Sequence, residues 1–194
     1  MREAHVERST KETVVALDLD LDGTGVHTIA TPVPFLNHLL AQVATHGLVD
    51  INLRATGDTA IDDHHTVEDV GIVLGQALRQ ALGDSRGIAR YGSAIVPLDE
   101  ALALVAVDLS GRAYLAYDVS FRTARTGGFE TSLVEDFLRA FATNGRLTLH
   151  ARMVAGRSSH HIAEALFKAL GRALCQAVAA DPRREGVPST KGAL

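Results

Sequence analysis

The stretch ATHGLVDINLRATGDTAIDDHHTVEDVGIVLGQAL, residues 44–78, decides the fold, because its pattern returns as ATNGRLTLHARMVAGRSSHHIAEALFKALGRAL, residues 142–174. ATHG answers ATNG, and DINLRAT answers LTLHARM. LGQAL at 74–78 then matches LGRAL at 170–174, in register with one His-His doublet in each stretch. Two coincidences in register are hard to obtain by chance, so the sequence predicts an internal duplication.

Turn residues and periodicity predict the elements of the first copy. HVERST and ETVVALDLD are expected as strands, LDGTG as a hairpin turn and GVHTIA as the returning strand. Pro32 and Pro34 open a helix that ends at Gly47, which is expected as its C′ residue. VDINLRAT alternates like a half-buried strand, and HTVEDVGIVLGQALRQALG has helical spacing.

The second copy predicts the same order of elements. Strands lie within residues 91–121, followed by a helix in LVEDFLRAFATNG, a strand in LTLHARMV and a long helix in HHIAEALFKALGRALCQAV. The predicted fold is α+β, a duplicated β-β-α-β-α unit with pseudo-twofold symmetry, in which two small sheets pack on a central layer of helices. Residues 1–194 are expected to form one catalytic domain, made of halves 1–85 and 86–180 with a tail, 181–194.

Bulk properties exclude several classes of protein. The 194 residues are 46% hydrophobic and 22% charged, which is ordinary for a globular protein and excludes disordered and fibrous classes. No apolar run approaches the roughly 18 residues that span a bilayer, and the start lacks a secretory signal, so a cytoplasmic protein without a membrane partner is expected. A net charge of −4 argues against a nucleic-acid partner, and the single Cys175 excludes an intrachain disulfide.

Each copy contains a His-His-x-x-Glu motif at the start of a predicted helix. His64 and His65 point about 100° apart, so they suit two different metal ions, and Glu68 shares a face with either histidine. One such motif is equally well explained as a polar helix cap with solvated histidines. The second copy supplies the same three ligand types, which favours a two-metal site near the pseudo-twofold axis: His160, His161 and Glu164.

Three further histidines are candidates to support this site. His38 and His46 lie eight residues apart on one predicted helix, hence within about 80° of each other around it. His150 lies on a predicted strand, on the face opposite Leu149. Each alone is more often a surface or hydrogen-bonded histidine. Because the ligand set is nitrogen and oxygen only, Mn, Fe, Zn or Ni would fit, and the residues do not choose among them.

A second cluster of interest is basic. Arg90, Arg112 and Lys191 lie at turns or in the aperiodic tail, and Ser189 is close to the lysine. Guanidinium forks and an ammonium group suit a phosphorylated substrate. For any one of these residues, solvated surface charge explains the sequence equally well.

One motif points elsewhere. Residues 20–24, within DLDGT, match the nucleophile motif of haloacid-dehalogenase-type phosphatases, in which Asp20 would be essential. That motif needs a strand end leading into a helix or cap, whereas GVHTIATP is expected as a returning strand. The phosphatase hypothesis is therefore the weakest of those considered.

Four long segments carry a resemblance to a known family: GDTAIDDHHTVED, PLDEALALVAVDLSGRAY, SSHHIAEALFKALGRAL and PSTKGAL. They resemble the imidazoleglycerol-phosphate dehydratases, and the match covers nearly the whole chain. RSTKET and FLNHLL are also similar, although Asn37 and Leu39 stand where the family more often has Asp and Met. No segment has room for the phosphatase to which some family members are fused, so the resemblance implies the monofunctional form.

The resemblance implies a hydro-lyase of histidine biosynthesis that removes water from imidazole glycerol phosphate to give imidazole acetol phosphate. It implies two Mn²⁺ per active site, with sites at subunit interfaces of a 24-subunit homo-oligomer. The implied metal ligands are His38, His64, His65, Glu68, His150, His160, His161 and Glu164. The implied catalytic residues are Glu12, His46, Glu68 and Glu164. The implied substrate contacts are Glu12, Arg90, Arg112, Ser189 and Lys191.

A non-catalytic alternative stays open from the residues alone. A metal-storing or structural shell protein would keep the histidines, but it would not need a phosphate-binding cluster. Retention of the basic residues together with Ser189 favours the enzyme.

Overall fold

The computed structural model describes residues 2–192 and contains two halves with the same order of elements. The first half consists of β1 (Glu3–Ser9), β2 (Thr13–Asp20), β3 (His27–Ala30), α1 (Pro34–Gly47), β4 (Asp50–Gly57) and α2 (His64–Leu82). The second half consists of β5 (Tyr91–Leu98), β6 (Ala101–Asp108), β7 (Tyr114–Asp118), the short hairpin β8 (Arg125–Thr126) and β9 (Phe129–Glu130), α3 (Leu133–Gly145), β10 (Thr148–Ala155) and α4 (Ser159–Val178).

The predicted fold class is confirmed. Each half has a third sheet strand before its first helix, β3 or β7, and the second half adds the short hairpin of β8 and β9. The two four-stranded sheets have the equivalent orders β1-β2-β4-β3 and β5-β6-β10-β7. The predicted hairpin between β2 and β3 is wrong, because β3 pairs in parallel with β4, with Ile29 opposite Leu53. The chain passes from the interior strand β2 over β4 to the edge strand β3, so LDGTG is part of a crossover loop.

Alternating burial turns one face of each sheet toward the helices. In β2, Val15, Leu17 and Leu19 are buried, and the residues between them are more exposed. In β10 the predicted alternation is confirmed, since Leu149 and Ala151 are buried. The inner faces and the helices form one continuous hydrophobic core.

The structure aligns β4 with β10 one residue away from the alignment of DINLRAT with LTLHARM in the sequence, and this structural alignment of the two halves is called here the repeat register. Ile51 lies four residues after Gly47 and Leu149 lies four residues after Gly145, and both are buried in the sheet interior. Buried side chains must match between the copies, because a one-residue slip would turn each strand over. Ile51 therefore corresponds to Leu149.

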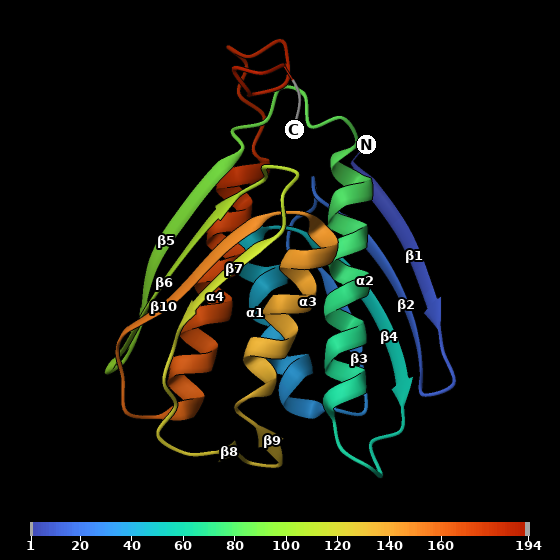
Figure 1. Ribbon diagram of the computed structural model, residues 1–194, viewed down its shortest axis with the longest axis vertical. Coiled ribbons are helices and arrows are strands. Elements are labelled where there is room, and N and C mark those ends of the chain that lie inside the picture. The colour runs from blue at the N-terminus through green and yellow to red at the C-terminus, as the bar shows by residue number, and fades with distance from the viewer. Residues whose placement is uncertain (1, 193–194) are drawn as a thin grey trace.

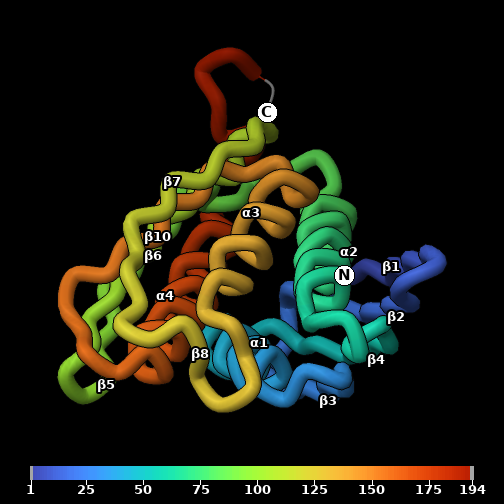
Figure 2. Tube along the Cα trace, turned by 60° about the horizontal axis from the view of Figure 1, so that its bottom comes forward, coloured from blue at the N-terminus to red at the C-terminus, as the bar shows by residue number. Residues whose placement is uncertain are grey.

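The helices lie between the two sheets, which splay apart like the sides of a tent (Figure 1). α2 packs on β1 and β2, while α4 packs on β5 and β6. Between them the first helix of each half packs on the second helix of the other, α1 on α4 and α3 on α2. All four helices begin at the same end of the molecule, as the turned view shows (Figure 2). No helix in residues 2–192 is long and apolar enough to cross a bilayer.

Glycines let the paired helices approach closely. A Cβ added to Gly171 would lie 2.8 Å from the carbonyl oxygen of Val43, and one added to Gly75 would lie 2.6 Å from that of Phe141. Gly47 was expected as a left-handed C′ residue, but it is the last helical residue, and Leu48 adopts the left-handed conformation with φ 54°. Gly47 instead lies at a close helix contact, where an added Cβ would come 3.3 Å from the carbonyl oxygen of Gly171.

We expect Gly75→Ala and Gly171→Ala each to lower the free energy of unfolding by about 1–3 kcal/mol, because the methyl group overpacks against a backbone carbonyl. Chemical denaturation would measure the change. Gly128→Ala is the control, since a Cβ at Gly128 meets nothing within 4 Å. A gain of about 1 kcal/mol, as for alanine in an unobstructed helix, would contradict the close crossing.

Candidate functional site

The first group of candidate metal ligands joins α1 to α4 and consists of His38, His160 and Glu164, called here the α1–α4 cluster. Nε2 of His38 lies 2.9 Å and Nε2 of His160 lies 3.1 Å from the same carboxylate oxygen of Glu164. Burial opposes ionisation of Glu164, but hydrogen bonds from Lys168 and His38 outweigh it and hold its pKa at about 2. Glu164 is thus an anion ready to bind a cation.

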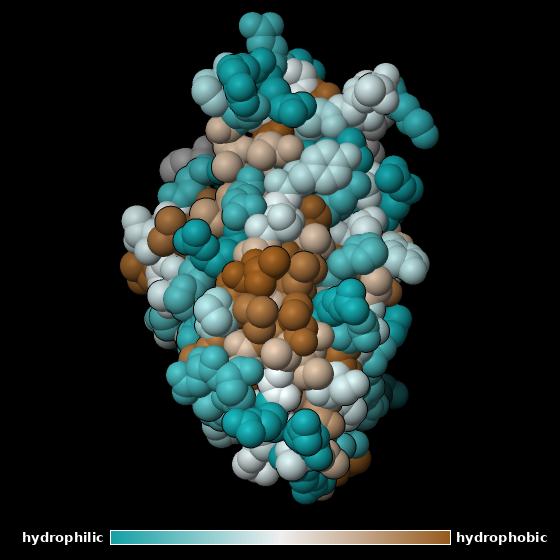
Figure 3. Space-filling view, turned by 90° about the vertical axis from the view of Figure 1, so that its left-hand side faces the viewer, coloured by the Kyte–Doolittle hydropathy of each residue, from teal (hydrophilic) through white to brown (hydrophobic). Residues whose placement is uncertain are grey.

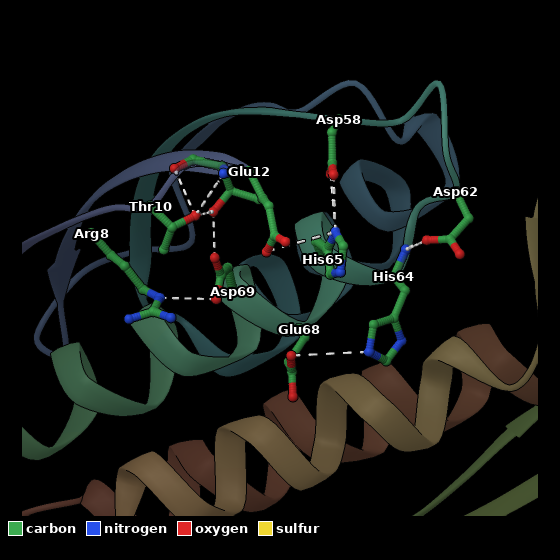
Figure 4. Close-up of polar contacts among 10 residues, drawn as sticks. Arg8, Thr10, Glu12, Asp58, Asp62, His64, His65, Glu68 and Asp69 are labelled. Carbon is green, nitrogen blue, oxygen red and sulfur yellow. Dashed lines mark hydrogen bonds and ion pairs between the residues drawn. The ribbon is translucent and has the colours of Figure 1, made fainter.

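The second group consists of Glu12, Asp58 and His65, called here the hairpin cluster (Figure 4). Nδ1 of His65 lies 3.0 Å from Oδ2 of Asp58 and 3.9 Å from Oε2 of Glu12. The hydrogen bond with Asp58 raises the pKa of His65. Glu12, predicted as a substrate contact, therefore lies beside a predicted metal ligand.

His64 contacts a residue that the sequence analysis missed. Its Nδ1 lies 3.3 Å from Oδ2 of Asp136 on α3, and its Nε2 lies 4.0 Å from Glu68. Asp136 stands nine residues before Gly145, just as His38 stands nine residues before Gly47. The repeat register carried this signal, although the two equivalent residues differ in type.

Glu100 was missed in the same way. Its carboxylate lies 2.7 Å from Nδ1 of His161 and accepts hydrogen bonds from the backbone N–H groups of Arg157 and Ser158. The His161 contact is the main cause that lowers the pKa of Glu100 to about 2. Glu100 is the last residue of the β5–β6 turn, directly before β6, as Glu12 is the last residue of the β1–β2 turn, directly before β2.

The two motifs do not merge into one cluster within residues 2–192 of a single chain. His64 and Asp136 line a cavity of about 390 Å³, while His38 and His160 line a cavity of about 470 Å³. Asp63 lines both, so the cavities are neighbours. Each motif instead meets the first helix of the opposite half.

The donor sets fit a divalent ion. In each three-residue cluster, imidazole nitrogen and carboxylate oxygen atoms lie within 4.8 Å of one another. Such ligands suit Mn, Fe, Zn or Ni. His161 and His65 each have a carboxylate on Nδ1, which leaves Nε2 free to bind, an arrangement common for metal-binding histidines.

Two of the three supporting histidines lie outside both clusters. His150 is on the exposed outer face of β10, with its ring 6.0 Å from that of Tyr114. His46 is half-buried in the last turn of α1, where burial, followed by the charges of Lys168 and Arg172, lowers its pKa.

The basic residues gather at the other end of the molecule. Arg90 donates to both carboxylate oxygens of Asp108, at 2.6 and 3.1 Å, and to the carbonyl oxygen of Pro188 at 2.8 Å. It therefore ties the tail, with Ser189 and Lys191, to the sheet. Arg112 is exposed in the turn after β6.

The two ends are far apart within one chain. His160 begins α4, whereas the backbone N–H of Arg90 donates to the carbonyl oxygen of Ala177 near the end of that helix. Seventeen residues of α-helix separate them by about 25 Å. One small substrate cannot contact both ends of the same chain.

The phosphatase motif lacks its structural context. Asp20 ends β2, and the following loop leads to β3 and not to a helix. Asp22 pairs with Arg2, and the loop is held by backbone N–H groups that donate to the Asp50 carboxylate. DLDGT therefore serves as a crossover loop.

Comparisons with known proteins identify relatives of the chain and of its fold. The family model described as "Imidazoleglycerol-phosphate dehydratase" matches residues 31–174. The dehydratase of Moorella thermoacetica is 58% identical over 193 residues, covering 100% of this chain and 98% of its own length. The crystal structure of the Staphylococcus aureus dehydratase matches with a TM-score of 0.84 and 40% identity, over 92% of this chain and 99% of its own. The crystal structure of the Pyrococcus furiosus enzyme in complex with (S)-C348 matches with a TM-score of 0.85 and 38% identity, over 97% of this chain and 100% of its own.

The family model and these relatives define the class of the protein as a hydro-lyase. The chain belongs to the imidazoleglycerol-phosphate dehydratase family, which acts in histidine biosynthesis.

In the metal-free protein, Glu100→Gln should lower the pKa of His161 toward its usual value of 6.5, because the Glu100 hydrogen bond is the largest cause that raises it. NMR titration of the ring protons would measure this. His65 is the internal control, since Asp58 is the main cause of its raised pKa. An unshifted His161 would show that the contact is absent in solution.

The same pair gives a pH-dependent stability. The hydrogen bond with Glu100 raises the pKa of His161, so the protonated ring stabilises the folded state. This stabilisation is fully present below pH 6.5 and is lost as the pH rises through the pKa of His161 in the folded state. The lowered pKa of Glu100 stabilises the fold above pH 4.5, and this effect is lost as pH falls toward about 2. The loss of stability in Glu100→Gln should therefore be largest between pH 4.5 and 6.5, measured by thermal unfolding.

Proposed function

We propose that this protein removes water from imidazole glycerol phosphate to give imidazole acetol phosphate, with two Mn²⁺ per active site. The observation that carries the proposal is the pair of histidine–carboxylate clusters at one end of the helices, together with a cationic cluster about 25 Å away at the other end. A phosphorylated imidazole needs both kinds of site. We expect the enzyme in the cytoplasm.

The metal ions would be held by the motif histidines and by Glu68 and Glu164, with His38 completing the α1–α4 cluster. Asp136 is a further ligand candidate because of its contact with His64. Bound divalent ions supply Lewis acidity, which draws electron density from an attached imidazole ring.

The chain's own residues move the proton and hold the substrate. The C–H bond on the carbon two positions from the ring breaks, the hydroxyl leaves from the carbon next to the ring, and the resulting enol becomes the ketone. Glu12 is the candidate shuttle, since its carboxylate is exposed beside His65. The phosphate would be bound by Arg112, from the turn after β6, and by Ser189 and Lys191 of the tail. Arg90 holds that tail in place through the carbonyl oxygen of Pro188.

The separation of the two ends requires a shared site. The substrate, an imidazole, three carbons and a phosphate, spans about 10 Å at bond lengths near 1.5 Å, so the phosphate-binding end must come from another subunit. Assembly into 24 subunits would meet this need.

An apolar surface supports such assembly. The outer face of the second sheet carries a continuous hydrophobic patch (Figure 3), on which exposed Ile95 pairs across strands with Leu104, and Val154 is also exposed. Patches of this kind mark protein interfaces.

The direct test is turnover of imidazole glycerol phosphate by chelator-stripped protein, before and after addition of Mn²⁺. We expect activity only with metal, and a loss of at least about 100-fold in His160→Ala. Arg54→Ala, at an exposed position of β4, is the control. A protein that binds metal and assembles without turnover would favour a storage or structural shell instead.

Subunit sharing is tested by mixing two inactive variants, His160→Ala and Arg112→Ala/Lys191→Ala, then dissociating and reassembling them together. If one chain supplies the ligands and another the cations, hybrid sites should restore about a quarter of the wild-type activity in a symmetric assembly. Variants assembled separately and then mixed are the control. Absence of restored activity in verified hybrids would contradict the shared site.

A further inference from the structure

A buried polar network joins the first sheet to α2 and has no place in the proposed chemistry. Asp69, only 6% exposed, accepts a hydrogen bond from Nε of Arg8 at 2.9 Å and another from the Thr13 hydroxyl (Figure 4). A buried carboxylate costs free energy unless it is paired, so the network needs a reason beyond packing.

The network continues to the tip of the β1–β2 hairpin. The Thr13 hydroxyl lies 3.3 Å from that of Thr10, which accepts hydrogen bonds from the backbone N–H of Glu12 at 3.1 Å and of Thr13 at 3.0 Å. A chain of hydrogen bonds thus runs from Asp69 to the backbone of Glu12. Within residues 2–192 the Glu12 carboxylate itself accepts no hydrogen bond.

The second half shows that folding does not require this network. Leu17 pairs with Leu53 in the first sheet, and the equivalent pair in the second sheet is Val105 with Ala151. Thr13 lies four residues before Leu17, and Ala101 lies four residues before Val105. Ala101 is therefore the equivalent of Thr13. By the same register, the positions equivalent to Arg8 and Asp69 hold apolar residues, namely Val96 and Ala165. In the second half, α4 packs on β5 and β6 as α2 packs on β1 and β2, with no polar side chain at these three positions.

The two hairpin glutamates differ accordingly. Glu100 anchors its own hairpin, because both its oxygens are engaged, by His161 and by the backbone of Arg157 and Ser158. Glu12 makes no such anchor and is 55% exposed. Its hairpin is held instead from behind, through Asp69, which leaves the carboxylate free.

We propose that Asp69 is a positioning residue that, with Arg8 and Thr13, fixes the β1–β2 hairpin so that the free carboxylate of Glu12 stays beside His65. The inference rests on the proposed function in one respect, the role of Glu12 toward the substrate. The anchoring itself is independent of that role.

The test copies the second half into the first. The variant Arg8→Val/Thr13→Ala/Asp69→Ala should fold and assemble, because the second half already packs this way. We expect amide hydrogen exchange at Glu12 and Thr13 to rise at least tenfold, and kcat to fall by roughly 10- to 100-fold with KM nearly unchanged, as for a misplaced catalytic group. Asp69→Asn, which keeps the shape but loses the charge, should give a smaller loss and serves if the triple variant does not fold.

A Glu12→Gln background separates positioning from general structure. If Asp69 acts through Glu12, the triple change should lower kcat little further in that background, whereas a structural role predicts the same loss in both. Asp22→Ala, which breaks the Arg2 ion pair on the same sheet, is the matched control and should leave both readouts unchanged.

The outcomes are distinguishable. Unchanged hydrogen exchange in the triple variant, or equal losses of kcat in both backgrounds, would overturn the positioning role. Wild-type protein that is inactive with Mn²⁺ would overturn the proposed function instead, while hydrogen exchange would still decide whether Asp69 holds the hairpin.

Discussion

The close crossing of helices at glycine is the constraint on which the rest of the structure depends. Gly171 lies against the backbone of Val43, and Gly75 lies against that of Phe141, at separations that leave no room for a Cβ. Helices that touch through their backbones have little freedom to slide or rotate, because neighbouring side chains must interdigitate around the contact. The two crossings are equivalent, so one packing solution serves twice.

The crossings also build the candidate site. Since α1 packs on α4 and α3 on α2, the first turns of helices from opposite halves lie together. His38 therefore reaches Glu164, and Asp136 reaches His64. Neither half alone could form these contacts, so the α1–α4 cluster and the His64–Asp136 pair depend on the union of the halves, whereas the hairpin cluster lies within the first half.

The sequence predicted what depends on local patterning and missed what depends on tertiary context. The helices, the inward faces of the strands and the duplication followed from periodicity and repetition. The pairing of β3 with β4 did not, because a turn signal says nothing of which strand a segment joins. Glu100 and Asp136 were missed because a duplicated site can use different residues at equivalent places, and Gly47 was correctly singled out for the wrong reason.

Duplication within one chain separates residues that fold from residues that act. The two halves have the same backbone fold. A polar side chain in one half that is replaced by an apolar side chain in the other is therefore not required to form that fold. Asp69 against Ala165 is such a pair. The outer sheet faces differ in the same way: His5, Asp18 and Asn52 are hydrogen-bonded on the first, whereas Ile95 packs beside Leu104 on the second. One face is suited to solvent and the other to a partner, and this difference breaks the symmetry that the helices preserve.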